Sequence, residues 1–265
     1  MANPISADKT VLRHTLLVNM LENAMTNTRF TPEQQVFEIG SVYYKHADGE
    51  LPEEPHRLAI LMTGPRAKAE WMGDAASGNV DFFDLKGVIA GLLDGLHIDD
   101  LTYERAKHPS LHPGRSATIK VDEETVGDFG ELHPLVARAF DLTDYPVLIA
   151  ELDLEQIMAL TPVNHLLKDI PNTPPVLEDI ALVVPEDTEA AAIEKVIWEA
   201  GGDLLRAVTL FDVYQGDSIE AGHKSLAYSL VYQAMDRTLT DKQATKLRNK
   251  IIKSVEKRTG AKLRA

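Results

Sequence analysis

Hydrophobic residues in the C-terminal third of the chain recur with two different periods. Leucine and tyrosine occupy every second position between residues 225 and 233, which is typical of a strand with one buried face. After Thr240 the apolar residues recur every three or four positions, as on one side of a helix, and Thr240 with Gln243 fits a capping box. The predicted elements are a strand at 176–184, a helix capped by Thr188 that ends at Ala200, strands at 204–214 and 225–233, the helix after Thr240 and a strand at 261–264. This β-α-β-β-α-β order predicts a ferredoxin-like fold whose helices cover one sheet face and leave the other free.

The preceding part of the chain mixes helical periods with short strands. Apolar residues at helical spacing predict a helix over 8–27 and a second helix over 82–96 that Asp81 caps. The residues of the first helix predicted to face inward are Val11, Leu12, Thr15, Leu16 and Met20. The strands are predicted at 35–44, 57–62, 115–121, 126–132 and 147–152, a short helix at Pro134, and a buried row of Leu85, Ile89, Leu92 and Leu96 on the second helix. Runs of strands with few helices predict an α+β fold built on an antiparallel sheet.

A proline-rich segment separates these two patterns. Prolines at positions 171, 174 and 175 remove backbone donors and push the residues before them towards extended geometry. We therefore predict two domains, residues 1–165 and 176–265, joined by a stiff linker at 166–175.

Composition narrows the class of protein. With 265 residues, 44% of them hydrophobic and 26% charged, the chain has the balance of a globular protein with one large or two ordinary domains. The absence of cysteine excludes disulfide scaffolds, thiolate zinc sites and cysteine nucleophiles, and makes the cytoplasm the expected location. No apolar run approaches the length of a membrane span, and the first nine residues do not resemble a signal peptide.

Charge is distributed unevenly along the chain. The net charge of −14, from 27 Lys and Arg against 41 Asp and Glu, argues against binding to polyanions. Residues 1–170 hold 14 basic and 27 acidic residues, a net of −13, whereas residues 171–265 hold 13 and 14. Within that second part, residues 236–265 hold 10 basic and 3 acidic residues, a net of +7. The C-terminal segment is therefore the part suited to phosphates.

Motifs for catalysis or metal binding are weak. His108 and His112 have the spacing of metal ligands and His133 lies nearby, but Pro109 and Pro113 favour a loop, where such histidines bond backbone or solvent. The sequence contains no phosphate loop, no nucleophile elbow and no metalloprotease motif. We therefore predict neither a catalytic residue nor a metal site.

The segment Phe211-Asp212-Val213-Tyr214 is a more informative candidate. Strand alternation puts Asp212 and Tyr214 on one face and Phe211 and Val213 on the other. A carboxylate beside an aromatic ring on an open sheet face suits stacking on a nucleic-acid base while reading its edge. An ordinary polar strand face is the alternative interpretation.

Several segments together resemble the C-terminal part of the β subunits of bacterial phenylalanyl-tRNA synthetases. In the second predicted domain they are LFDVYQG at 210–216, GHKSLAY at 222–228 and RTLTD at 237–241, and in the first VLRHTLL at 11–17, FEIGSVYY at 37–44, LHPGRSA at 111–117 and GELHP at 130–134. The resemblance covers nearly the whole chain. It implies a class II synthetase-like antiparallel sheet with flanking helices, followed by a ferredoxin-fold anticodon-binding domain.

The resemblance implies that the first domain lacks catalytic activity. Class II active sites use an arginine after the strand that Phe37–Tyr44 resembles, whereas Lys45 and His46 follow here, and a glycine-rich segment ending in arginine is missing. We expect this module to dock on the α subunit, which holds the active site in an α2β2 enzyme. No cofactor is expected here, because ATP and Mg²⁺ would act through parts outside this chain.

The resemblance also implies the residues that contact tRNA(Phe). Tyr214 would stack on an anticodon base, Asp212 would accept hydrogen bonds from a guanine, and Ser225 would add a hydroxyl contact. The basic residues from Arg237 onward would attract phosphates, and the individual candidates are Lys224, Arg237 and Lys242.

The family's β subunit is far longer, so we expect a fragment that neither edits nor aminoacylates alone.

Two other classes of protein stay open. A small active class II ligase is disfavoured by the missing arginines. An amino-acid-sensing regulatory protein is the other alternative, since ferredoxin-like folds also serve that role.

Overall fold

The computed structural model describes residues 10–46, 51–66, 78–164, 170–216 and 218–264. The chain divides into two compact units, residues 1–165 and 166–265, each with its own sheet. The proline-rich segment at 166–175 follows this junction, and its residues 166–169 lie outside the described part of the chain. At its C-terminal end, the Thr173 carbonyl accepts a hydrogen bond from the Gln233 side chain.

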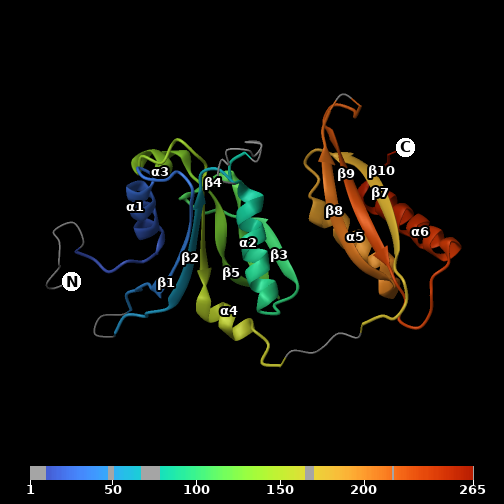
Figure 1. Cartoon of the computed structure of the whole chain (residues 1–265), viewed down its shortest axis with the longest axis horizontal. Helices are drawn as coiled ribbons and strands as arrows, with labels where there is room; N and C mark the ends of the chain where they lie inside the picture. Colours follow the sequence, from blue (N-terminus) through green and yellow to red (C-terminus); the bar gives the residue numbers. More distant parts are fainter. Residues whose placement is uncertain (1–9, 47–50, 67–77, 165–169, 217, 265) are drawn as a thin grey trace. The chain divides into compact units, whose positions relative to one another are not determined.

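The first unit is built on a six-stranded sheet. Its strands are β1 (Gln34–Ser41), β2 (His56–Thr63), β3 (Leu101–Arg105), β4 (Leu111–Val121), β5 (Glu124–Leu132) and β6 (Val147–Asp153). Every neighbouring pair is antiparallel, and the spatial order is β1-β2-β6-β5-β4-β3 (Figure 1). The predicted antiparallel α+β class is therefore confirmed.

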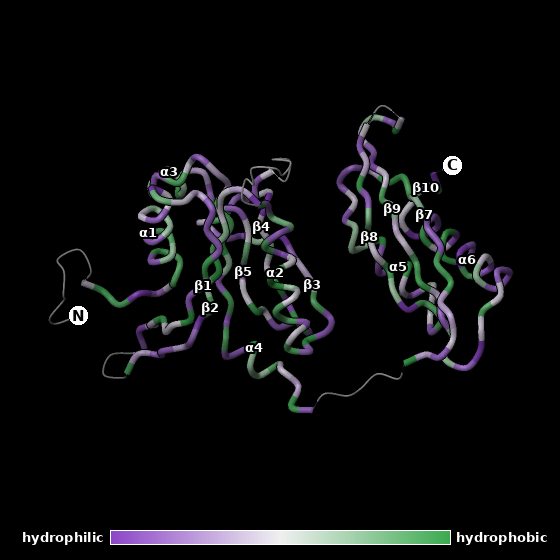
Figure 2. The backbone as a smooth tube through the Cα atoms, in the orientation of Figure 1, coloured by the Kyte–Doolittle hydropathy of each residue, from purple (hydrophilic) through white to green (hydrophobic). Residues whose placement is uncertain are grey.

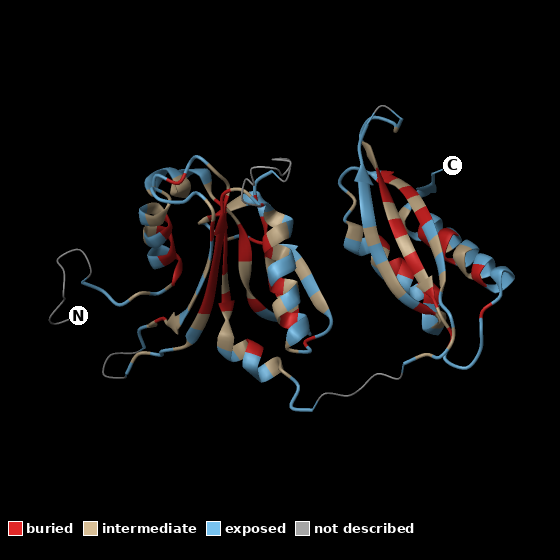
Figure 3. Ribbon diagram, in the orientation of Figure 1, coloured by how far each residue is buried: buried red, intermediate tan, exposed pale blue. Residues whose placement is uncertain are grey.

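Helices cover both faces of this sheet. They are α1 (Leu17–Asn27), α2 (Phe82–Gly95), α3 (Pro134–Ala139) and α4 (Leu154–Leu160). Because side chains alternate along a strand, Leu58 and Ile60 of β2 join the core under α2 and α4. Ala59 and Leu61 join the opposite core, with α1 and α3. The sheet between the two cores is mostly buried (Figure 3).

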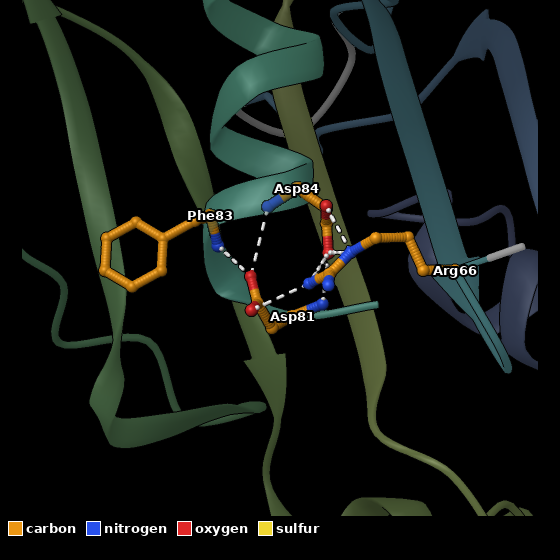
Figure 4. Close-up of polar contacts among 4 residues, drawn as sticks. All are labelled: Arg66, Asp81, Phe83 and Asp84. Carbon is orange, nitrogen blue, oxygen red and sulfur yellow. Dashed lines mark hydrogen bonds and ion pairs between the residues drawn. The ribbon is translucent and has the colours of Figure 1, made fainter. Parts of the chain in front are cut away.

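A network of two aspartates and one arginine fixes the start of α2 (Figure 4). The Asp81 carboxylate accepts hydrogen bonds from the amides of Phe83 and Asp84 at 2.8 and 3.3 Å, and the Asp84 carboxylate accepts one from the Asp81 amide at 2.7 Å. Arg66 donates to both carboxylates, and its hydrogen bonds hold the pKa of Asp84 below its usual value. The predicted cap is confirmed.

Helix α1 is shorter than the sequence predicts. It begins at Leu17, because the Glu151 carboxylate of β6 accepts hydrogen bonds from the Thr15 hydroxyl and, at 2.6 Å, from the Leu16 amide. These bonds tie Thr15 and Leu16 to β6, and residues 11–15 are not helical. Val11 and Leu12 are consequently 73% and 41% exposed, so their predicted inward orientation is wrong, whereas Leu16 and Met20 are buried as predicted. Positions 8 and 9 of the predicted helix lie outside the described residues.

Other boundaries in the first unit also differ from the prediction. Strand β1 ends at Ser41 rather than at 44, and β4 starts at Leu111 rather than at 115. Strand β3 and helix α4 were not predicted, since both are short and lack a clear apolar period. The fully buried row of α2 is Leu85, Ile89 and Leu93, whereas Leu92 and Leu96 are only partly buried.

The second unit is a four-stranded antiparallel sheet with two helices. Its elements are β7 (Val176–Pro185), α5 (Ala190–Gly201), a 3₁₀ turn at Gly202–Leu204, β8 (Leu205–Tyr214), β9 (His223–Tyr232), α6 (Asp241–Thr259) and β10 (Lys262–Leu263). The spatial order is β10-β7-β9-β8 (Figure 1). This is the predicted βαββαβ arrangement. The N-cap of α5 is Glu189 rather than the predicted Thr188, whose amide instead donates to Pro185 in a turn.

Both helices pack on the same face of this sheet. Leu226, Tyr228, Leu230 and Tyr232 alternate along β9 and are at most 1% exposed, as the period of two predicts. They join one core with Ile193 and Ile197 of α5 and Ile251 and Val255 of α6. The Gln243 side chain accepts from the Thr240 amide at 2.9 Å, and the predicted capping box of α6 is present. Hydrophilic and hydrophobic residues are interspersed along α6 (Figure 2), and the buried ones lie on one side, as in an amphipathic helix.

We expect Asp81→Ala to destabilise the first unit by about 1 kcal/mol, because two amides of α2 lose their acceptor. Urea denaturation followed by hydrogen exchange of α2 peptides measures this. Asp94→Ala, an exposed substitution in the last turn of the same helix, is the control and should not destabilise. Equal losses in both variants would contradict a capping role.

The two buried tyrosines of β9 should respond differently to loss of their hydroxyl. The Tyr228 hydroxyl donates to the Ala190 carbonyl at 3.3 Å, whereas the Tyr232 hydroxyl has no hydrogen-bond partner among the described residues. Burial, with a smaller contribution from Glu178, raises the pKa of Tyr232 to about 12. Tyr228→Phe should therefore cost about 1 kcal/mol, and Tyr232→Phe should be neutral or stabilising. Hydrogen exchange of β9 peptides in urea compares the variants, and a larger loss for Tyr232→Phe would refute this account.

Candidate nucleic-acid interface

The sheet face opposite α5 and α6 is open and nearly flat at its centre. Because antiparallel partners share a face, Ala181, Ala227 and Ser229 of β7 and β9 point to this side together. Their small side chains lie next to the exposed carboxylate of Asp179, which pairs with Ser229 on the same face. Lys262 of β10 pairs with Val183 and lies on the same face. A flat floor with polar groups at its margin leaves room for a planar ligand.

A β-bulge decides which residues of β8 reach this face. Leu210 pairs with Tyr228, whose side chain lies in the core, but the next pair is Asp212 with Ala227. Phe211 is therefore the extra residue of a bulge. After it, Asp212 and Tyr214 share the open face, as alternation predicts, and Phe211 is 57% exposed.

Tyr214 lies at the end of β8, against a glycine and an arginine. A Cβ at Gly216 would come within 2.5 Å of the Tyr214 hydroxyl, so a larger residue there would make the outer end of the ring shift. The Arg264 guanidinium lies 5.0 Å from the ring centroid, in a cation–π contact. The backbone amide of Arg264 donates to the Ala181 carbonyl of β7. Tyr214 is 37% exposed, so part of the ring is accessible.

The structure brings four of the six predicted tRNA contacts to one end of the sheet. Tyr214 pairs with Ser225, and Asp212 lies two positions away on the same strand and face. Asp212 is exposed, whereas Ser225 is only 2% exposed, between Tyr214 and Val183 on the neighbouring strands. Lys224 is adjacent in β9 and half-buried, and alternation turns it towards the helix face.

The other two predicted contacts lie elsewhere. Arg237 follows the last residue of β9, at the opposite end of the sheet from Tyr214, and pairs with Asp236 at 3.0 Å. Lys242 lies in the first turn of α6, on the helix side. Lys262 and Arg264 belong to the basic segment from Arg237 onward that was expected to attract phosphates. Their place on the open face was not predicted, because it depends on β10 pairing with β7, some eighty residues earlier in the chain.

A cavity of about 240 Å³ lies on the sheet of the first unit, beside α1 and β6. Arg57 in its wall forms an ion pair with Asp153. Burial disfavours the charge of Arg57, but hydrogen bonds with Asp153 and Tyr44 outweigh this and raise its pKa. Glu151 accepts from Thr15 and Leu16, so these charged side chains are already engaged within the protein.

The three histidines singled out in the sequence bond to backbone. The Nδ1 atoms of His108, His112 and His133 accept hydrogen bonds from the amides of Ser110, Gly114 and Leu135, each two residues further along, at 3.0–3.2 Å. Among the described residues, no group of three or more His, Cys, Asp or Glu could hold a metal ion. Nor is any described helix long and apolar enough to cross a membrane.

An antiparallel, helix-covered sheet followed by a ferredoxin-like domain with an open face agrees with the organisation that the resemblance to synthetase β subunits implies. Residues 1–154 match the family model of the phenylalanyl-tRNA synthetase beta chain CLM domain. Residues 171–264 match the model of the ferredoxin-fold anticodon binding domain. The chain therefore belongs to the family of phenylalanyl-tRNA synthetase beta chains, and the resemblance seen in the sequence is confirmed.

Curated relatives agree with this assignment. The chain is 38% identical over its whole length to a phenylalanine–tRNA ligase beta subunit of Bacillus cereus, 41% identical to that of Symbiobacterium thermophilum and 37% identical to that of Bacillus subtilis. It covers 32%, 29% and 33% of these proteins. The chain thus spans about a third of the length of the curated relatives it matches.

Proposed function

We propose that this chain acts as a non-catalytic part of a phenylalanine–tRNA ligase, which docks on the α subunit and binds the anticodon region of tRNA(Phe). The observation that carries the proposal is the open sheet face with Asp212, Tyr214 and Ser225 at one end, in a domain that belongs to the anticodon-binding family. Family membership also favours this interpretation over an amino-acid-sensing regulator or a small active ligase.

The chemistry of the open face suits an unpaired base. The exposed part of the Tyr214 ring offers a stacking surface, and the carboxylate of Asp212 can accept from the N–H groups on the Watson–Crick edge of guanine. Ser225 pairs with Tyr214 on the neighbouring strand, but its side chain is only 2% exposed, so Tyr214 and Asp212 would make the main contacts with the base. Such contacts need bases that are splayed out, as in an anticodon loop, because paired bases hide these edges.

The first unit offers a surface for a protein partner. An apolar groove of about 360 Å³ lies between α2 and the edge strand β1, and Phe37 and Ile39 on β1 are 72% and 53% exposed beside it. Exposed aromatic side chains of this kind anchor protein interfaces. We assign this groove to the α subunit.

The remaining elements of the proposal concern the full enzyme. It would be an α2β2 assembly in the cytoplasm, where translation takes place. ATP and Mg²⁺ would act at the active site of the α subunit, and this chain would hold no cofactor of its own. The ion pair of Arg57 with Asp153 supports this, since Arg57 is not free to hold a triphosphate.

We expect Tyr214→Ala to weaken binding of a tRNA(Phe) anticodon stem-loop by about 1–3 kcal/mol, because a stacking surface is lost. Fluorescence anisotropy with the labelled stem-loop measures the change. Tyr214→Phe is the matched control, since it keeps the ring, and should retain most of the affinity. If both variants bind like the unchanged chain, the base does not stack on this face.

The docking surface can be tested by replacing one exposed aromatic residue. Phe37→Ser should lower the affinity for the α subunit about tenfold or more, as expected for a buried interface anchor. The control is Leu135→Ser on α3, which is 66% exposed and lies away from the groove. Co-elution with the α subunit in size-exclusion chromatography, with titration by calorimetry, gives both affinities. Equal affinities for the two variants would place the α subunit elsewhere.

A further inference from the structure

Five lysines form a single row along α6. A helix turns by about 100° and rises 1.5 Å per residue, so the row lies within an arc of about 80° and is about 22 Å long. Its members are Lys242, Lys246, Lys250, Lys253 and Lys257. It points away from the buried residues of the same helix, Ala244, Ile251 and Val255. We call these five residues the lysine row.

The lysine row is exposed and unneutralised. All five side chains are exposed, and no ion pair links them to an acidic residue in the described part of the chain. The two arginines of α6 differ, because Arg248 contacts Glu178 at 3.6 Å and Arg258 pairs with Glu199. Positive charge on the outer side of α6 is therefore available to a ligand.

The lysine row and the open sheet face lie on opposite sides of the same unit. α6 packs its apolar side on the face that carries Tyr228 and Tyr232, whereas Asp212 and Tyr214 pair with residues of the other face. The sheet therefore lies between the two surfaces. A base stacked on Tyr214 and a phosphate on Lys250 must belong to different stretches of nucleic acid.

The residues around the lysine row indicate a phosphate backbone rather than another partner. Lysine is depleted at protein–protein interfaces, where aromatic residues and arginine are enriched, and α6 has no aromatic residue. Without aromatic rings, unpaired bases have nothing to stack on. Thr245 and Asn249 lie among the lysines along one shallow depression and can donate to phosphate oxygens, whereas the Ser254 hydroxyl already donates to the Lys250 carbonyl. This combination favours the backbone of paired RNA.

We propose that the lysine row is a second nucleic-acid site, which binds the phosphate backbone of double-stranded RNA without reading its sequence. A row of about 22 Å can follow several consecutive phosphates of one strand. The site does not require Tyr214, Asp212 or Ser225, and it would let the unit hold two stretches of RNA at once.

The test uses the full 265-residue chain and a labelled 20-base-pair RNA duplex unrelated to any tRNA. Anisotropy titrations between 50 and 200 mM salt, the range over which phosphate contacts change affinity strongly, give the affinity and its salt dependence. The triple variant Lys246→Gln, Lys250→Gln, Lys253→Gln should weaken binding by about tenfold or more and reduce the salt slope by about 3, one unit for each lost phosphate contact. Glutamine preserves helix propensity, and circular dichroism verifies folding.

Two comparisons make the result decisive. The variant Lys86→Gln, Lys107→Gln, Lys120→Gln removes the same charge from the first unit, and Tyr214→Ala removes the stacking ring. Both should bind the duplex like the unchanged chain. The proposal is overturned if the first-unit variant loses as much affinity as the lysine-row variant, or if the unchanged chain does not bind the duplex at 50 mM salt. It is also overturned if a polyglutamate peptide, but not the duplex, requires the lysine row.

Discussion

The second unit depends on one constraint: its two helices cover only one face of its sheet. Alternation in β9 turns Leu226, Tyr228, Leu230 and Tyr232 towards α5 and α6, so the intervening small residues face outward. A shift of one residue would expose the leucines and bury the serines, which fixes the register strongly. The same packing turns the polar side of α6 outward. Two surfaces of different chemistry therefore follow from one hydrophobic contact.

The bulge at Phe211 allows β8 to place residues both in this core and at the candidate site. Leu210 must stay in the core opposite Tyr228, yet strict alternation would then turn Asp212 and Tyr214 to the helix side as well. Because the bulge adds one residue to β8, the alternation of side chains between the two faces shifts by one position, and both side chains lie on the open face. Alternation in the sequence predicted that they share a face. It could not predict which face, because that depends on pairing with β9.

The sequence predicted elements with strong periods and missed features that depend on distant contacts. The central strands and helices α2 and α6, with their caps, were recognisable from local pattern alone. The true start of α1 was not, because Glu151 binds Thr15 and Leu16 from 135 or more residues away. In the same way Arg237 and Lys242 seemed close to the anticodon residues only in sequence. Strand β9 leads away from Tyr214 and places them at the far end of the sheet.

The net charge of −14 does not oppose nucleic-acid binding by the second unit. Screening limits the influence of a surface charge to about 8 Å at physiological ionic strength, so a phosphate responds to its nearest side chains and not to the whole chain. Many carboxylates of the first unit are also engaged internally, such as Asp153 with Arg57 and Glu151 with Thr15. Within that distance the lysine row lies beside uncharged Thr245 and Asn249 and beside two carboxylates of the same helix, Asp241 and Glu256, so its five lysines leave a net positive charge. The arrangement of charge along α6, rather than its total over the chain, therefore decides where RNA can bind.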